Sequence, residues 1–165
     1  MMQTTTIRVA ATGMLLLAIT SVRQAEAARA AALRLGAPRI TKEGVAVPVH
    51  LVAHRSSAVA ALNFDLRYDP SALAVRVVTP GPAVTAAGAQ LSSRADGGVL
   101  RALVVPAFRP DMPALRGRVA TVQLAVRGGP RRGLGRWLRQ RIHLEQVVLG
   151  DATGREFRPA TRKGH

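Results

Sequence analysis

Residues 60–70 read A-A-L-N-F-D-L-R-Y-D-P, and they are the clearest indication of the fold class in the sequence. Its apolar side chains occupy alternate positions: Leu62, Phe64, Leu66 and Tyr68. Polar side chains fill the positions between them: Asn63, Asp65 and Arg67. Because successive side chains of a strand point to opposite faces, this period of two predicts a β-strand with one buried face. Asp69-Pro70-Ser71 follows with residues typical of a tight turn.

From about Ala31 onward the chain consists of short apolar runs, interrupted by Gly, Pro, Asp or Asn about every eight to twelve residues. Further strands are predicted over residues 45–51, 73–78, 99–105, 118–127, 142–149 and 155–158. Long helical periodicity is absent from the sequence. The spacing therefore predicts an all-β domain, an antiparallel β-sandwich of about seven to nine strands in two packed sheets.

Some segments support more detailed expectations. Pro48 cannot donate to a sheet ladder, so it places its strand at an edge or a bulge. Residues 99–105 are apolar on both faces except at Arg101, which predicts a central strand. Residues 151–154, D-A-T-G, predict a hairpin turn. Residues 83–93 fit either a loop or a weak strand.

The N-terminus has the pattern of a secretory signal peptide over residues 1–27. Arg8 precedes an apolar run over residues 9–19, and Ala25 and Ala27 form an A-x-A cleavage site. The apolar run is shorter than the roughly 20 residues of a membrane-spanning helix. We expect cleavage after Ala27 and export to the medium or the cell surface, with an uncleaved anchor as the alternative.

The chain carries a formal net charge of +15 and has no cysteine. The absence of cysteine excludes a disulfide framework and thiolate metal sites, so the domain must be stabilised by its hydrophobic core. The positive charge is compatible with an anionic partner. However, Lys42 and Lys163 are the only lysines among the basic residues, and this arginine bias is partly compositional.

Two groups of residues are candidate binding sites. The first is the polar row of the central stretch, a candidate partner-binding site: Asn63, Asp65 and Arg67. An ordinary solvated strand face is the alternative for this row. The second is a candidate anion-binding cluster around the single tryptophan: Arg131, Arg132, Arg136, Trp137, Arg139 and Arg141. Here the alternative is a loop whose tryptophan plugs the sandwich or covers a sheet edge.

The sequence offers no candidate catalytic residues, metal ligands or cofactor site. It has no G-x-S-x-G elbow, phosphate loop or H-E-x-x-H motif. His50 and His54 would lie about 13 Å apart along a strand, with no carboxylate near them in sequence to complete a metal site. We therefore expect a protein that binds and does not catalyse a reaction.

Four segments in order resemble the cohesin module. They are V-A-V-P-V-H-L (45–51), A-L-N-F-D-L-R-Y-D-P-S-A-L (61–73), G-R-V-A-T-V-Q-L-A-V (117–126) and I-H-L-E-Q-V-V-L-G-D-A-T-G (142–154). The likeness spans roughly residues 32–158 and implies a jelly-roll sandwich, for which we expect domain bounds of 28–158. The residues after it, 159–165, are expected from the sequence itself to form a disordered tail. Cohesins present polar contact residues on the strand that leads to Y-D-P, at positions that fall at Ala61 and Asn63, and Ala61 departs from that pattern.

The resemblance also implies a non-catalytic function and partners of a particular kind. Cohesins of polysaccharide-degrading assemblies bind dockerin modules through the outer face of one sheet, and the calcium belongs to the dockerin. The leading expectation is thus an exported module that recognises a dockerin-like protein or a polysaccharide. The alternatives are an accessory protein that binds anionic polymers through residues 131–141, and a structural component of a surface assembly that pairs through a sheet edge.

Overall fold

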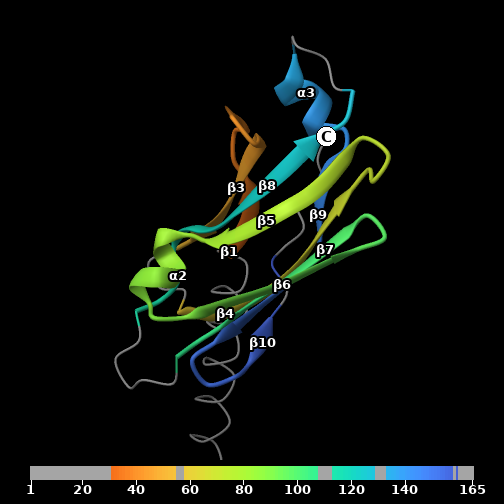
Figure 1. Cartoon of the computed structure of the whole chain (residues 1–165). Coiled ribbons are helices and arrows are strands. Elements are labelled where there is room, and N and C mark those ends of the chain that lie inside the picture. The colour runs from red at the N-terminus through yellow and green to blue at the C-terminus, as the bar shows by residue number, and fades with distance from the viewer. Residues whose placement is uncertain (1–30, 55–57, 108–112, 129–132, 158, 160–165) are drawn as a thin grey trace, which may run out of the picture.

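The computed structural model describes residues 31–54, 58–107, 113–128, 133–157 and 159. The expected signal peptide (1–27) and nearly all of the expected tail lie outside these residues. In the described part, two β-sheets pack face to face, and a short helix lies at either end of the sandwich (Figure 1). The predicted antiparallel β-sandwich is confirmed.

The first sheet has the order β1-β3-β8-β5, and β2 also pairs with β3. Its strands are β1 (Ala31–Leu35), β2 (Arg39–Thr41), β3 (Gly44–Ala53), β5 (Leu73–Pro80) and β8 (Gly117–Val126). The second sheet has the order β10-β9-β4-β7-β6. Its strands are β4 (Val59–Tyr68), β6 (Gln90–Asp96), β7 (Val99–Val105), β9 (Ile142–Asp151) and β10 (Glu156–Phe157). The described part thus has two five-stranded sheets, slightly more strands than the sequence predicts, because β1 and β2 precede the first strand expected from the sequence.

The core lies between the two sheets and is built by the predicted alternation. In β4 the apolar positions point inward, and Leu62, Phe64 and Leu66 are each at most 1% exposed. The facing strands of the first sheet contribute buried partners: Val47, Val49, Val122 and Leu124. Each such side chain adds about 1.5–3 kcal/mol through burial. With no disulfide available, this apolar layer is the main source of stability.

Pro48 lies in an internal strand, at a place where that strand is locally an edge. β3 lies between β8 and the β1/β2 side, with β1 pairing to residues 49–53 and β2 to residues 44–46. The Gly36 amide donates to the Pro48 carbonyl across this side, at 2.7 Å. Because the N and O of one strand residue point the same way, the missing N–H of Pro48 faces the gap between β1 and β2. A register shift follows between Val49 and His50.

Residues 83–93 form neither a plain loop nor a single strand. They contribute to a short helix, α2 (Pro82–Ala86), and to the edge strand β6. Val84 anchors α2 in the core and is fully buried. The predicted hairpin turn at residues 151–154 is present, since Asp151 Oδ1 accepts hydrogen bonds from the amides of Thr153 and Arg155 at 2.9 and 3.0 Å.

Candidate functional site

The outer face of the second sheet is the candidate site, and it spans strands β9, β4, β7 and β6. The register of these strands aligns their outward side chains in rows across the sheet. One row runs from β9 to β6 through four charged residues: Glu145, Asp65, Arg101 and Arg94. The next row is uncharged and has two apolar and two polar side chains: Val148, Asn63, Leu103 and Ser92. We call the outward side chains of these four strands the outer face.

The predicted partner-binding residues Asn63, Asp65 and Arg67 all lie on the outer face. They point away from the core, and Asn63 and Arg67 are exposed. The structure thus brings the three together along one strand, as the sequence predicts. The neighbours on β7 and β9 complete the face.

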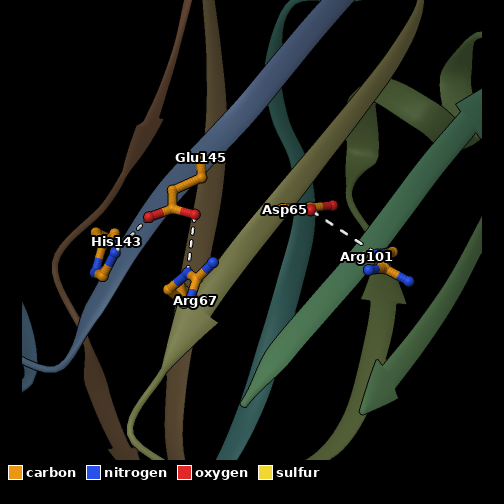
Figure 2. Close-up of polar contacts among 5 residues, drawn as sticks. All are labelled: Asp65, Arg67, Arg101, His143 and Glu145. Carbon is orange, nitrogen blue, oxygen red and sulfur yellow. Dashed lines mark hydrogen bonds and ion pairs between the residues drawn. The ribbon is translucent and has the colours of Figure 1, made fainter. Parts of the chain in front are cut away.

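A chain of polar contacts crosses the β9 side of the outer face (Figure 2). Arg67 Nε donates to Glu145 Oε2 at 2.9 Å, and His143 Nε2 lies 2.9 Å from Glu145 Oε1. The hydrogen bond from Arg67 is the main reason that the pKa of Glu145 lies below its ordinary value, and the contact with His143 lowers it further. Glu145 is therefore an anion held between two basic side chains.

On the β7 side the charges are less well matched. Arg101 Nε lies 3.9 Å from Asp65 Oδ2, so the two charges attract without a short hydrogen bond (Figure 2). The side chain of Arg101 is 74% exposed, whereas that of Asp65 is 16% exposed. Asp65 is consequently a largely covered carboxylate, and Arg101 can reach outward to a second group.

A bulge in β9 shapes the middle of the outer face. The register with β4 shifts between Asn63 and Asp65, and Gln146 takes a positive φ of 47°. A non-glycine residue in this region is strained, and bulges that re-aim side chains are common beside functional sites. A depression of about 410 Å³ lies beside the bulge. Asn63, Asp65, Arg101 and Gln146 are among the residues that line it.

Two apolar side chains of β7 are open to solvent on the same face. Leu103 is 44% exposed and Val105 is 39% exposed. β7 is a central strand as predicted, between β4 and β6, but its outward side is not covered by protein in the described residues. The alternate positions 101, 103 and 105 form the outward side of β7, and they include the charged Arg101. The sequence did not reveal that Leu103 and Val105 are exposed, because a strand buried on both faces has a similar apolar sequence.

The predicted arginine cluster is divided by the structure. Arg131 and Arg132 lie outside the described residues. Arg136 and Arg139 are exposed on the short helix α3 (Leu134–Arg139). The cluster's tryptophan is partly buried against the core, next to the fully buried Leu138.

Arg141 is engaged in contacts within the fold. Its guanidinium carbon lies 4.4 Å from the centre of the Trp137 ring, a cation–π contact. Its Nε lies 3.5 Å from Asp69 Oδ2, and the Asp69 amide donates to its carbonyl at 3.1 Å. Arg141 thus links α3 to the Y-D-P turn, and Arg136 and Arg139 are the described cluster members that face solvent.

The described residues hold no group of three His, Asp or Glu side chains close enough to bind a metal ion. No helix among them is long and apolar enough to cross a membrane.

The architecture and the outer face define a β-sandwich binding module with a partly polar, partly apolar sheet surface. The cohesin domain model matches residues 40–128, more than half of the chain. The chain therefore belongs to the cohesin domain family, a family of non-catalytic binding domains. The resemblance noted in the sequence is confirmed. No curated protein sequence matches the chain closely enough to indicate a relative.

Several solved structures share the fold. A non-cellulosomal cohesin from the archaeon Archaeoglobus fulgidus is 16% identical, with a TM-score of 0.56 over 79% of this chain and 85% of its own. The sixth cohesin of scaffoldin B from Acetivibrio cellulolyticus, solved with a mutant Cel5 dockerin, is 16% identical; the match has a TM-score of 0.58 and covers 77% and 92% of the chains. A cohesin module from a family 33 glycoside hydrolase of Clostridium perfringens is 12% identical, with a TM-score of 0.56 and coverage of 79% and 90%. At these identities the likeness shows the fold alone.

Proposed function

We propose that this protein is an exported cohesin-type module that binds a protein partner of the dockerin kind through the outer face. The single observation that carries the proposal is the sheet surface where Asn63, Asp65 and Arg67 lie beside the exposed Leu103 and Val105. Membership of a binding-domain family supports it, and so does the complex that one of the similar cohesins forms with a dockerin.

The outer face has the composition that a docking surface needs. Leu103 and Val105 offer apolar area that gains free energy when a partner covers it. The surrounding charged side chains supply a polar rim that fixes orientation and rejects other partners. A standard interface buries about 800 Å² on each side, which the outward residues of four adjacent strands can provide.

A protein partner fits this surface better than a polysaccharide does. Sugar rings commonly stack on open aromatic faces. Of the aromatic side chains whose surroundings the structure describes, Phe64 is fully buried, and Tyr68 and Trp137 pack against the core. The arginines of residues 131–141 remain the alternative site, for anionic polymers.

The signal-peptide pattern supports the same function. Residues 1–27 have the charged, apolar and small-residue segments of a signal peptide. A protein released to the medium or held at the cell surface would meet enzymes and scaffolds that are exported by the same route. Cleavage after Ala27 would place the new N-terminus just before β1, and N-terminal sequencing of the exported form tests this directly.

Capture of partners from the culture supernatant of the source organism tests the proposed function. The exported protein is used as bait at low and moderate salt, and recovered proteins and glycans are both identified. The triple variant N63A/D65A/R67A is compared with T79A/T121A/Q123A, whose residues lie on the outward side of the first sheet.

We expect a discrete protein that resists moderate salt, is lost with N63A/D65A/R67A and is retained by the control variant. A glycan as the main salt-resistant product would overturn the choice of a protein partner. A mixed set of polyanions released by moderate salt would instead favour the arginine segment of residues 131–141.

A further inference from the structure

Two arginines face each other across the β6–β7 pair without adequate neutralisation. Arg94 and Arg101 are direct partners in the antiparallel register, so their side chains leave the sheet on the same side. Like charges placed directly opposite destabilise a sheet. Asp65 lies 3.9 Å from Arg101 Nε. Asp96 follows on the same side of β6, yet no ion pair to Arg94 occurs among the described residues. The pair is therefore only partly neutralised.

Both arginines line the depression beside the β9 bulge, together with neutral hydrogen-bond donors. The depression measures about 410 Å³, and its lining includes Asn63 and Ser92. A guanidinium presents several N–H groups in a planar fork, an amide presents two, and a hydroxyl presents one. A small anion in this depression would be surrounded by donors, two of them charged.

We propose that this depression receives a single carboxylate of the bound partner, from an Asp or Glu side chain or a chain terminus. This inference rests on the proposed function, because it names the chemistry that the partner brings to the outer face. Guanidinium forks match the two oxygens of a carboxylate, and such charge-assisted hydrogen bonds are the stronger ones in proteins.

The local charge favours a monoanion over a phosphate or sulfate dianion. Arg94 and Arg101 contribute +2 and Asp65 contributes −1 to the lining, which leaves +1. One carboxylate neutralises this charge, whereas a dianion would leave an excess negative charge beside Asp65. The exposed Leu103 in the same lining also suits the aliphatic stem of an acidic side chain.

Asp65 competes with the incoming carboxylate for Arg101. Replacing Asp65 by Asn keeps the shape of the side chain and removes the competing charge. Carboxylate binding should then become tighter, whereas loss of either arginine should weaken it. A merely structural role of the three residues would not produce these opposite effects on carboxylate affinity.

A titration with a small monocarboxylate tests the proposal on the intact exported protein. The probe is N-acetyl-aspartate N-methylamide, and the neutral isostere is N-acetyl-asparagine N-methylamide. NMR follows the amides of β6 and β7 and the side-chain Nε–H groups of Arg94 and Arg101. The variants are R94Q/R101Q and D65N. The control is R34Q/R76Q, which removes the same charge from two exposed residues of the first sheet.

We expect the acid to cause saturable chemical-shift changes that are confined to residues of the depression, and we expect no such changes with the neutral isostere. Affinity should fall about tenfold or more in R94Q/R101Q, rise in D65N, and stay within about twofold in R34Q/R76Q. An equal loss in both double variants, or an equal response to the neutral isostere, would overturn the proposal. Tighter binding of inorganic sulfate than of the acid would overturn the choice of a carboxylate.

The titration needs no natural partner, so its outcome is separate from that of the capture experiment. If the probe binds but no protein is captured, the carboxylate receptor stands and the proposed function fails. If a protein is captured and R94Q/R101Q captures it as well as wild type does, the proposed function stands and the carboxylate receptor fails.

Discussion

At the scale of single residues, Gly81 holds α2 against the first sheet by close backbone approach. Its amide donates to the Val119 carbonyl at 2.9 Å. A Cβ at this position would lie far inside van der Waals distance of the Arg118 carbonyl oxygen, a backbone atom that cannot move easily. The φ of Gly81 is −83°, so space and not backbone conformation requires a glycine here.

We predict that G81A lowers the free energy of unfolding by about 2 kcal/mol or more, because β8 and the start of α2 must separate. G135A is the matched control, since a Cβ there meets only Pro38 at an ordinary 3.8 Å. Within α3 that alanine should leave stability unchanged or raise it by up to about 1 kcal/mol. Urea unfolding of both variants measures the difference. Equal losses of unfolding free energy in G81A and G135A would contradict the close backbone approach at Gly81.

Asp69 is the residue for which the structure predicts a clear pH effect. Its carboxylate accepts hydrogen bonds from the Ser71 hydroxyl at 2.6 Å and the Ser71 amide at 3.0 Å. The hydroxyl is the main cause that lowers the pKa of Asp69, and the charge of Arg141 contributes less. Because the pKa is lower in the folded state, the stabilisation is complete above the unfolded pKa of about 3.9 and is lost as pH falls through the folded pKa.

We predict that an NMR titration of the Asp69 carboxyl gives a midpoint below the ordinary aspartate pKa. S71A should raise this pKa more than R141Q does, because the hydroxyl hydrogen bond is the larger cause. The stability difference between wild type and D69N should also shrink as pH falls below about 3.9. A larger rise in R141Q than in S71A would show that the ion pair, and not the turn, controls this pKa.

At the scale of elements, the bulge in β9 stores strain at the centre of the outer face. Replacing Gln146 by Gly should raise stability by about 1 kcal/mol, since glycine adopts a positive φ without a steric penalty. Q123G in β8 is the control: Gln123 lies in a paired strand, and its amide donates to Thr41 Oγ1 at 2.5 Å. This variant should lose about 0.5–1 kcal/mol or more. Thermal unfolding of both variants measures these changes in stability. A lower stability of Q146G than of wild type would contradict the presence of backbone strain at Gln146.

The elements differ in how far their sequence reveals them. β4 and β8 alternate apolar and polar residues cleanly, so their bounds and buried faces follow from the period of two. The α2 and β6 segment is composed mainly of small and polar residues, and one buried residue, Val84, holds the helix in place. Its structure depends on tertiary contacts with β8 and β7, which local propensity does not contain.

The candidate site could be predicted only in part for a related reason. Asn63, Asp65 and Arg67 share one strand, so their common face is visible in the sequence. Glu145 and Arg101 join them through strand register, and Arg67 and Glu145 are 78 positions apart in the chain. Register is set by packing of distant segments, and a shift of one residue would turn every side chain to the other face.

At the scale of the whole molecule, the two sheets offer two outward surfaces, and we expect the partner to bind only the outer face of the second sheet. The net charge of +15 gives long-range attraction to any anionic partner and does not select a surface. Selection depends on the exposed apolar side chains and the charged rows of the second sheet. Each sheet carries exposed apolar residues, which allows a comparison within one molecule.

Hydroxyl-radical footprinting of the protein, free and with its captured partner, distinguishes binding at the outer face from binding at the first sheet. Leu103 and Val105 report on the outer face, and Val52 and Val77 report on the outward side of the first sheet. We predict that the partner protects Leu103 and Val105 strongly and leaves Val52 and Val77 as reactive as in the free protein. Protection of Val52 and Val77, with Leu103 and Val105 unchanged, would contradict binding at the outer face.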